Sequence, residues 1–283
     1  MDLGPMPPTA DVGPVADDAG RLEPIAPGVW VWLGTDGQGR PGPNVGVIVE
    51  DDGITLIDTT PAPSAARALN EELKRFGVPV RRVVYTSSHV ESVGGSAVFW
   101  MAARYGRAQT NALLEQLVPG YAHDYEDDFT TRPVSHVVDA AAWLTPLVCA
   151  VPVSGQQEEN LVVLVPSAGT MFTGAFATVG TTPNAWDGDP ERWADTLGEL
   201  REQATVIVPG VGPVADGMSL MVMQAYLYAV CDAQGDARRI ADGPWDDWSE
   251  RSLDAVNVER ASRLATGDRE VPVAMLQRLG LTP

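Results

Sequence analysis

Apolar residues follow the proline-rich start of the chain in short runs that have the length of strands. The runs cover residues 29–33, 45–50 and 54–58, where valine, isoleucine, leucine and tryptophan are frequent. A loop with glycine and proline joins the first two runs, and a tight turn at residues 51–53 joins the last two. Apolar runs between turn signals predict strands, so we expect a meander that opens a sheet.

A helical pattern follows the predicted meander. Helix-forming residues fill positions 65–76 with apolar side chains on one face, and Gly77 stands where a left-handed helix cap belongs. Residues 80–85 have the pattern of a short buried strand, and residues 94–105, after a polar loop, have that of a second helix. The first half of the chain is therefore predicted to follow the order βββαβα.

The second half of the chain repeats this alternation of strands and helices. Asp189 is a favoured N-cap residue and Pro190 fits the first helical position, so we predict a helix from there to about residue 202. Residues 218–231 are the longest apolar stretch, which is too short to cross a bilayer and predicts a buried core helix. Further elements are predicted as strands at residues 134–138, 147–153, 161–165, 170–173 and 205–208, a glycine loop at 209–213 and a polar helix near 257–264.

Length and composition favour one large folded unit with extensions at both ends. The 283 residues are 45% hydrophobic and 20% charged, as in globular proteins with a sizeable core. Residues 1–20 carry several prolines but neither a basic nor an apolar region, so we expect a disordered arm and no signal peptide. We place the main domain at residues 21–241 and a helical appendage, packed on that domain, at residues 242–283.

The charge of the chain narrows the classes of partner. Its 38 Asp and Glu residues against 19 Lys and Arg give a formal net charge of −19, which repels phosphate backbones and anionic membranes. We therefore expect no nucleic acid and no membrane as partners, and we leave the oligomeric state open; a small-molecule ligand is expected from the site described below. The two cysteines, Cys149 and Cys231, have apolar neighbours, which predicts buried free thiols and a reducing, cytoplasmic location.

The polar loop between the predicted strand and the second predicted helix is rich in serine and glycine. Residues 83–95 are VVYTSSHVESVGG. They resemble the T-H-x-H-x-D-H-x-G-G loop of the metallo-β-lactamase superfamily, with Thr86, His89 and the glycine pair at 94–95 on matching positions. Further segments resemble motifs of that family in the same order, at residues 56–59, 155–175 and 206–213. The resemblance spans roughly residues 28–230 and implies an α/β protein with a four-layer αββα metallo-β-lactamase-like sandwich.

The resemblance also indicates which positions would bind zinc in this family. They correspond, in chain order, to Ser87, His89, Glu91, Ser92, Gln156, Ala175 and Val211. A zinc pair needs about three protein ligands for each ion, and imidazoles and carboxylates supply most of them. One imidazole and one carboxylate remain at these positions, so we predict no metal site and no cofactor.

A rebuilt metal site is an alternative that the sequence leaves open. The other histidines are His123 and His136, and the first stands beside an acidic run at residues 124–128. Acidic runs are more often solvated loops than metal sites. An altered mononuclear metallohydrolase is therefore the least favoured interpretation.

Two functions fit the altered site better. In the first, the protein is a pseudoenzyme whose old active-site cleft binds a small molecule or a protein partner. In the second, it is a metal-independent hydrolase, lyase or cyclase that acts on a small ester, thioester or lactone. His89 would then be the base, assisted by Glu91 or by the hydroxyl of Ser87. A simpler interpretation of the loop is that His89 is a hydrogen-bonded remnant and the serines satisfy loop amides.

The remaining candidates are expected to bind a ligand or to brace the loop. Asp58 ends a strand where the family has an aspartate that supports the metal loop, although an Asx turn explains it equally well. The turn at residues 156–160 carries amides and carboxylates, which favour a neutral or basic ligand if they face the cleft; the alternative is that they face solvent. The predicted binding residues are Asp58, Ser88, Ser92, Gln156, Glu158, Asn160 and Val211.

Overall fold

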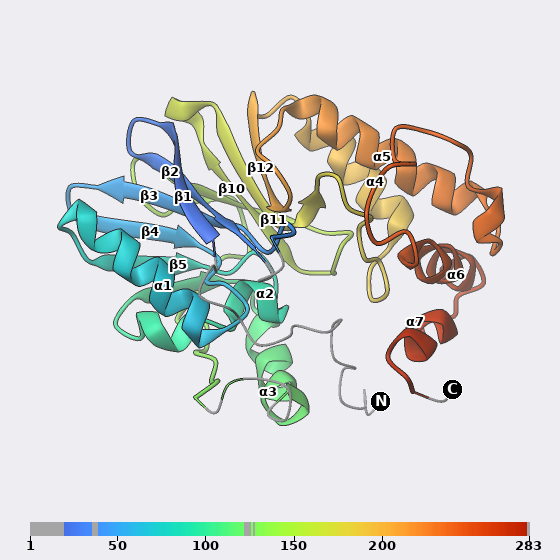
Figure 1. The fold of residues 1–283 in the computed structure, drawn as a ribbon, viewed down its shortest axis with the longest axis horizontal. Coiled ribbons are helices and arrows are strands. Elements are labelled where there is room, and N and C mark those ends of the chain that lie inside the picture. Colours follow the sequence, from blue (N-terminus) through green and yellow to red (C-terminus); the bar gives the residue numbers. More distant parts are fainter. Residues whose placement is uncertain (1–19, 36–38, 122–125, 127, 282–283) are drawn as a thin grey trace.

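The computed structural model describes residues 20–35, 39–121, 126 and 128–281. Two β-sheets face each other in the middle of the molecule, and helices cover the outer face of each sheet (Figure 1). The four-layer αββα sandwich predicted from the sequence is therefore confirmed. The N-terminal arm expected at residues 1–20 lies outside the described residues, except for Gly20, which begins the first strand.

Strand pairing sets the order of the two sheets. Among the described residues, the first sheet has the order β1 (Gly20–Ala26), β2 (Val29–Gly34), β3 (Val45–Glu50), β4 (Gly53–Ile57), β5 (Val80–Val84), β6 (Ala103–Gly106) and β7 (His136–Val137). The second has the order β12 (Val206–Val211), β11 (Thr170–Thr178), β10 (Asn160–Val165), β9 (Cys149–Val153) and β8 (Ala142–Trp143). The strands from β4 to β7 run parallel, which requires long connections between them.

The meander predicted from the apolar runs is confirmed as β2, β3 and β4, and neighbouring residues in it face opposite sides. Val47 of β3 packs under the helices on the outer face, while Ile48 packs between the two sheets. In the same way, Leu56 of β4 packs under the helices and Ile57 packs between the sheets. Because side chains alternate along a strand, a strand that is covered on both faces is apolar throughout.

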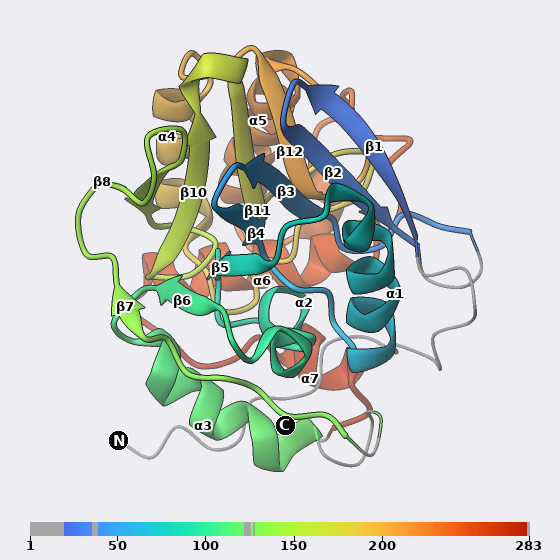
Figure 2. The same ribbon diagram turned by 90° about the vertical axis from the view of Figure 1, so that its left-hand side faces the viewer.

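Helices begin and end where the local sequence signals predict. α1 (Pro63–Leu73) continues into a short 3-10 helix that ends at Gly77, whose φ of 70° is the predicted left-handed cap. Asp189 caps α4 (Pro190–Leu200), since its side chain accepts a hydrogen bond of 3.1 Å from the backbone nitrogen of Arg192. The other helices near the sheets are α2 (Val90–Val93) and α3 (Thr110–Tyr121) on the side of the first sheet, and α5 (Gly217–Asp232) on the side of the second (Figure 2).

α5 is the core helix predicted from the longest apolar stretch. Leu220 and Met223 are fully buried in the cluster that joins α4, α5 and the second sheet, whereas Met218 is exposed. Both Cys149 and Cys231 are free thiols as predicted, but each is only partly buried. No helix in the described ranges has the length and apolar character needed to cross a membrane.

The prediction of a second helix in the first half of the chain, at residues 94–105, is wrong. α2 ends before this range, at Val93, and the chain then forms a 3-10 turn at residues 96–99 and strand β6, which pairs with β5. Gly94 and Gly95 lie against backbone, and a Cβ added to them would be 2.0 Å from the carbonyl oxygen of Pro61 and 2.1 Å from that of Thr59. This close approach, together with strand pairing, overrides the local helical pattern.

Several elements differ from the prediction in extent or were not predicted. β7 covers only residues 136–137 of the strand expected at 134–138. β12 continues to Val211, so the first part of the predicted glycine loop is a strand. The unpredicted elements are β1, β6, β8, α2, α3 and α7 (Val273–Arg278).

The C-terminal segment packs on the helices of the second sheet. α6 (Leu253–Ala265) contains the predicted polar helix, and its Asn257 is fully buried. The amide of Asn257 accepts a hydrogen bond from the backbone nitrogen of Ala185 at 2.9 Å and donates one to the carbonyl of Pro183 at 2.8 Å. The segment therefore holds the loop that precedes α4.

A glycine in the core between the two sheets gives a test of the packing. A Cβ added to Gly46 would lie 2.6 Å from a ring carbon of Phe172 and 2.7 Å from Cδ1 of Ile57. We expect Gly46→Ala to lower the free energy of unfolding by about 1–3 kcal/mol, as overpacking does in other cores. Urea denaturation measures this difference.

Gly198→Ala is the matched control for Gly46→Ala. The added Cβ would meet only the flexible end of the Gln224 side chain, and alanine favours the helical conformation of α4. We expect a free energy of unfolding within about 1 kcal/mol of the wild-type value. Equal destabilisation by the two substitutions would contradict the packing assigned to Gly46.

Candidate functional site

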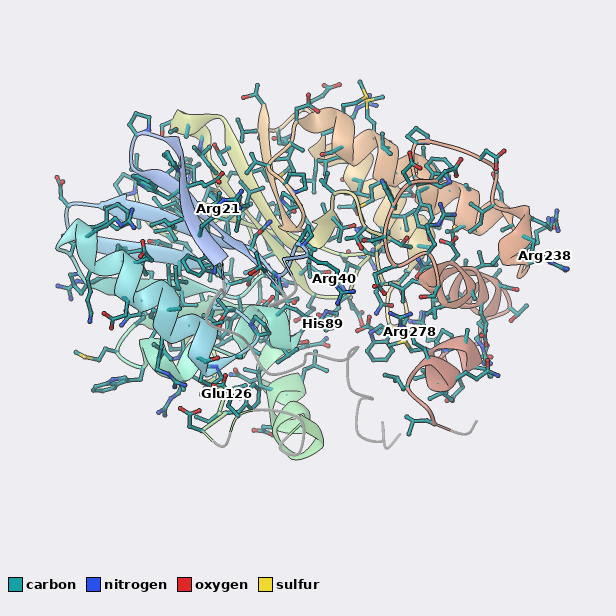
Figure 3. All side chains as sticks on the ribbon, in the orientation of Figure 1. Arg21, Arg40, His89, Glu126, Arg238 and Arg278 are labelled. Atoms are coloured by element: carbon teal, nitrogen blue, oxygen red, sulfur yellow. The ribbon has the colours of Figure 1, made fainter. Side chains whose placement is uncertain are left out.

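A pocket of about 130 Å³ lies where the ends of β4, β11 and β12 meet the loop before α2. Asn44, just before β3, fixes this junction because its amide donates hydrogen bonds to the carbonyls of Pro209 and Gly212 at 2.9 and 2.8 Å. Figure 3 shows His89 at this junction, between the two helix-covered halves. The pocket thus joins segments from both sheets.

Most of the site residues predicted from the sequence lie at this pocket. The lining includes Asp58, His89, Glu91, Ser92, Gln156 and Val211. Directly behind the wall lie Ser87, Ser88 and Asn160, which are buried. Glu158 lies exposed on the turn before β10 and is not part of the wall. The sequence analysis did not assign to the site the further lining residues Pro43, Asn44, Thr178, Asn184 and Trp186, because no motif marks them.

Both ring nitrogens of His89 have polar neighbours. Nε2 lies 3.1 Å from Oδ2 of Asp187 and 2.8 Å from Nε2 of Gln157, and Gln157 Nε2 is itself 3.0 Å from that Asp187 oxygen. Nδ1 lies 3.3 Å from Nε2 of Gln156. The imidazole is only 8% exposed, so these contacts replace water at both nitrogens. Neither Asp187 nor Gln157 was predicted from the sequence.

A chain of amide groups orients the NH₂ group that faces Nδ1 of His89. The backbone N–H of Gln157 donates to Oδ1 of Asn160 at 2.7 Å, so the other amide atom of Asn160 is its NH₂ group. That group donates to Oε1 of Gln156 at 2.8 Å, and the NH₂ group of Gln156 then donates to Nδ1 of His89. The NH₂ group of Gln157 faces Nε2 at 2.8 Å as well, because Oε1 of Gln157 accepts from the hydroxyl of Ser88. Oδ2 of Asp187 is thus the acceptor described at the ring, and a neutral His89 with its proton on Nε2 shares this oxygen with Gln157.

Opposing effects determine the pKa of His89. Burial lowers this pKa, whereas the charge of Asp187, the hydrogen bond to it and the charge of Glu91 raise it. The raising effects prevail, so the pKa of His89 lies above its ordinary value of 6.5. Protonation of Nδ1 would place an N–H against the NH₂ group of Gln156, so the cationic form requires that amide to turn.

The serines of the loop bond to other groups than the imidazole. Oγ of Ser87 accepts a hydrogen bond of 3.2 Å from the backbone nitrogen of His89 and lies 2.9 Å from Oγ of Ser92. Oγ of Ser88 donates to Oε1 of Gln157 at 3.3 Å. A nucleophilic serine needs its hydroxyl within hydrogen-bond reach of a base. The serine hydroxyls therefore serve as hydrogen-bond partners for other polar groups of the buried loop.

Asp58 anchors the start of the loop. Its two carboxyl oxygens accept hydrogen bonds from the backbone nitrogen of Thr86 at 2.8 Å and from the Thr86 hydroxyl at 2.6 Å. Burial raises the pKa of Asp58 to about 7, although the hydrogen bonds from Thr86 and Ser92 oppose this rise. Its φ of 66° is left-handed, a conformation that few residues other than glycine adopt. Both the burial of the carboxyl group and the backbone conformation of Asp58 therefore cost free energy next to the pocket.

The residues at the pocket do not fit a zinc pair. Ala175 and Val211, which occupy two positions of the family's ligand pattern, line the pocket with side chains that cannot bind metal. Among the described residues, no group of three or more His, Cys, Asp and Glu side chains is arranged to hold a metal ion. His136 is exposed on β7 and stacks on Tyr105 with ring centroids 4.8 Å apart, while His123 lies outside the described residues.

Solved structures show which fold this is. FIM-1 metallo-β-lactamase from Pseudomonas aeruginosa, in its mono-zinc form, superimposes with a TM-score of 0.64 at 20% identity, covering 75% of this chain and 96% of that one. A metallo-β-lactamase from Erythrobacter litoralis gives 0.62 at 18%, covering 76% and 98%. DIM-1 metallo-β-lactamase gives 0.61 at 17%, covering 74% and 96%. No family model matches the sequence. The protein thus has the metallo-β-lactamase fold.

Proposed function

We propose that this chain, which has the metallo-β-lactamase fold, is a metal-free binding protein that holds a small molecule in the pocket beside His89. The single observation that carries the proposal is the state of His89, whose imidazole lines the pocket. Gln156 and Asp187 engage its two nitrogens, so neither nitrogen is available to a metal ion or a substrate without breaking a hydrogen bond. The small volume of the pocket favours a small molecule over a protein segment. A cytoplasmic location, favoured by the two free cysteines, is part of the proposal.

Metal content tests this proposal directly. We expect less than about a tenth of an equivalent of zinc in the purified protein, before and after incubation with excess zinc and desalting, because binding of zinc requires several deprotonated ligands. Mass spectrometry measures the metal, and FIM-1 prepared in the same way is the positive control. Near-stoichiometric zinc that disappears in His89→Ala would contradict the proposal.

A metal-free hydrolase is the second candidate, and one observation favours it. The hydrogen bond between Asp187 and Nε2 of His89 is the arrangement in which a carboxylate orients a general base. Nδ1 would then have to leave Gln156 to accept a proton from a substrate. A panel of small esters, thioesters and lactones separates the two candidates: turnover that His89→Ala abolishes would support the hydrolase and overturn the binding protein.

A further inference from the structure

The charged side chains in the wall of the pocket are acidic. Asp58 and Glu91 line it together with His89, and no lysine or arginine is among the lining residues in the described part of the chain. Asp187, behind His89, is a third carboxylate, but it bonds to His89 and Gln157 and has Arg260 nearby, so the acidic character of the pocket rests on the carboxylates of the wall itself. The remaining polar groups in the wall are neutral amides and hydroxyls, which impose no sign of charge on a ligand. The described pocket therefore favours a cation over an anion.

The carboxylate of Glu91 has no partner that balances its burial. Its Oε2 atom is buried and has no hydrogen bond, and none of the described ion pairs includes Glu91. Burial of a carboxylate oxygen without a hydrogen-bond donor costs free energy. A ligand that supplies the missing donor would recover part of that free energy. A bound ammonium group would donate to this oxygen.

The hydrocarbon part of such a ligand could contact an aromatic side chain of the pocket, that of Trp186. Trp186 lines the pocket and is 5% exposed. Leu253, Val256 and Met275 of the C-terminal helices pack with it in a separate hydrophobic cluster, so the indole is held in place. A pocket lined by both an aromatic ring and a carboxylate has a composition that recognises organic ammonium ions. A pocket of about 130 Å³ is close to the cavity size that accommodates a benzene ring.

We infer that this pocket selects small organic cations, with a primary ammonium group against the carboxylate of Glu91 and a hydrocarbon part against Trp186. The inference rests on the proposed binding function and narrows it to one class of ligand. An organic cation also fits the residues better than a metal ion, because the described residues offer no group of three side chains that would hold one.

A matched set of three probes tests the inference on the full-length protein. Benzylamine, which is a cation at about pH 8, benzyl alcohol and benzoate share one ring and differ in charge. We expect benzylamine to raise the Tm and to bind one to one in calorimetry, at least about tenfold more tightly than benzyl alcohol, and benzoate not to bind, since the unpaired carboxylate attracts only the cation. Because this comparison uses the wild-type protein, it does not depend on the folding of any variant.

Two variants locate the binding site. Glu91→Gln should weaken benzylamine binding by at least about tenfold and leave benzyl alcohol binding unchanged, because it removes only the charge. Glu199→Gln, on the exposed side of α4, is the control for the same change in net charge and should bind benzylamine as the wild type does.

The possible failures are distinguishable. If benzyl alcohol or benzoate binds as tightly as benzylamine, or if none of the three binds, the assignment of an organic cation is wrong while the binding function without zinc stands. If Glu91→Gln folds with the wild-type Tm and keeps wild-type affinity, the placement of the ammonium group is wrong. Stoichiometric zinc or turnover in the same samples would instead overturn the proposed function itself.

Discussion

The wild-type protein will lose stability as the pH rises from about 5 to about 8, and the substitution Asp58→Asn will abolish most of this loss. Burial raises the pKa of Asp58 to about 7 in the folded protein, against 3.8 in a solvated chain. The folded state therefore binds the proton more tightly than the unfolded state. The resulting stabilisation is fully present below about pH 4 and is lost as the pH rises through about 7, when the buried carboxyl must ionise.

The expected size of this effect is large for one residue. A difference of this kind amounts to about 1.4 kcal/mol for each pH unit between the two pKa values, so we expect the wild type to lose on the order of 2 kcal/mol over this range. Asparagine does not ionise and tolerates the left-handed backbone at φ 66°. Urea denaturation at several pH values compares the two proteins.

Asp247→Asn is the control for the Asp58 experiment. Asp247 is exposed in the C-terminal segment, so its substitution should leave the pH profile of the wild type unchanged. The elevated pKa of His89 acts in the same direction as that of Asp58, but it is present in both proteins and cancels in the comparison. Parallel profiles for the wild type and Asp58→Asn would show that Asp58 does not titrate in this range.

The second large effect concerns Arg260 in α6, whose guanidinium connects the C-terminal segment to the pocket. It is 7% exposed and donates a hydrogen bond of 2.8 Å to the carbonyl of Gly188. Longer bonds reach the carbonyls of Asp187 at 3.4 Å and of Arg269 at 3.1 Å. Arg260 thus holds the loop that presents Asp187 to His89.

Arg260→Met should lower the free energy of unfolding by about 2–4 kcal/mol, because it leaves buried carbonyls without donors. Nitrogen NMR of the imidazole should also show His89 losing its single tautomer, since Asp187 is then less firmly held. Urea denaturation and the NMR spectrum are independent measurements. A loss of stability without any change at His89 would limit Arg260 to a structural role.

Arg263→Met is the matched control in the same helix. Arg263 forms ion pairs with Glu259 at 2.8 Å and Asp268 at 2.7 Å, and all three side chains are partly exposed to solvent. Surface ion pairs contribute little, so we expect a loss of at most about 1 kcal/mol and an unchanged His89 spectrum. Equal losses for the two arginines would contradict the role given to Arg260.

The sequence by itself determined the elements whose signals are local. The apolar runs predicted β2, β3 and β4 because every second residue of a strand faces the same side, and both faces are covered here. Gly77 and Asp189 marked helix ends because a cap depends on the residues next to it. The motif positions also indicated where the pocket lies. Six of the seven positions matched to the family's zinc ligands line it, and so does Asp58.

Only the tertiary structure decided the features that depend on residues far apart in the chain. Residues 94–105 have a helical pattern, but the backbone of Gly94 lies against Pro61 and β6 pairs with β5, so part of the segment is a strand. Asp187, the partner of His89, lies 98 residues further along the chain, in a loop that no motif marks. Periodicity and caps report interactions between neighbours in sequence, whereas the state of His89 depends on which loops the packed sheets and α6 bring together.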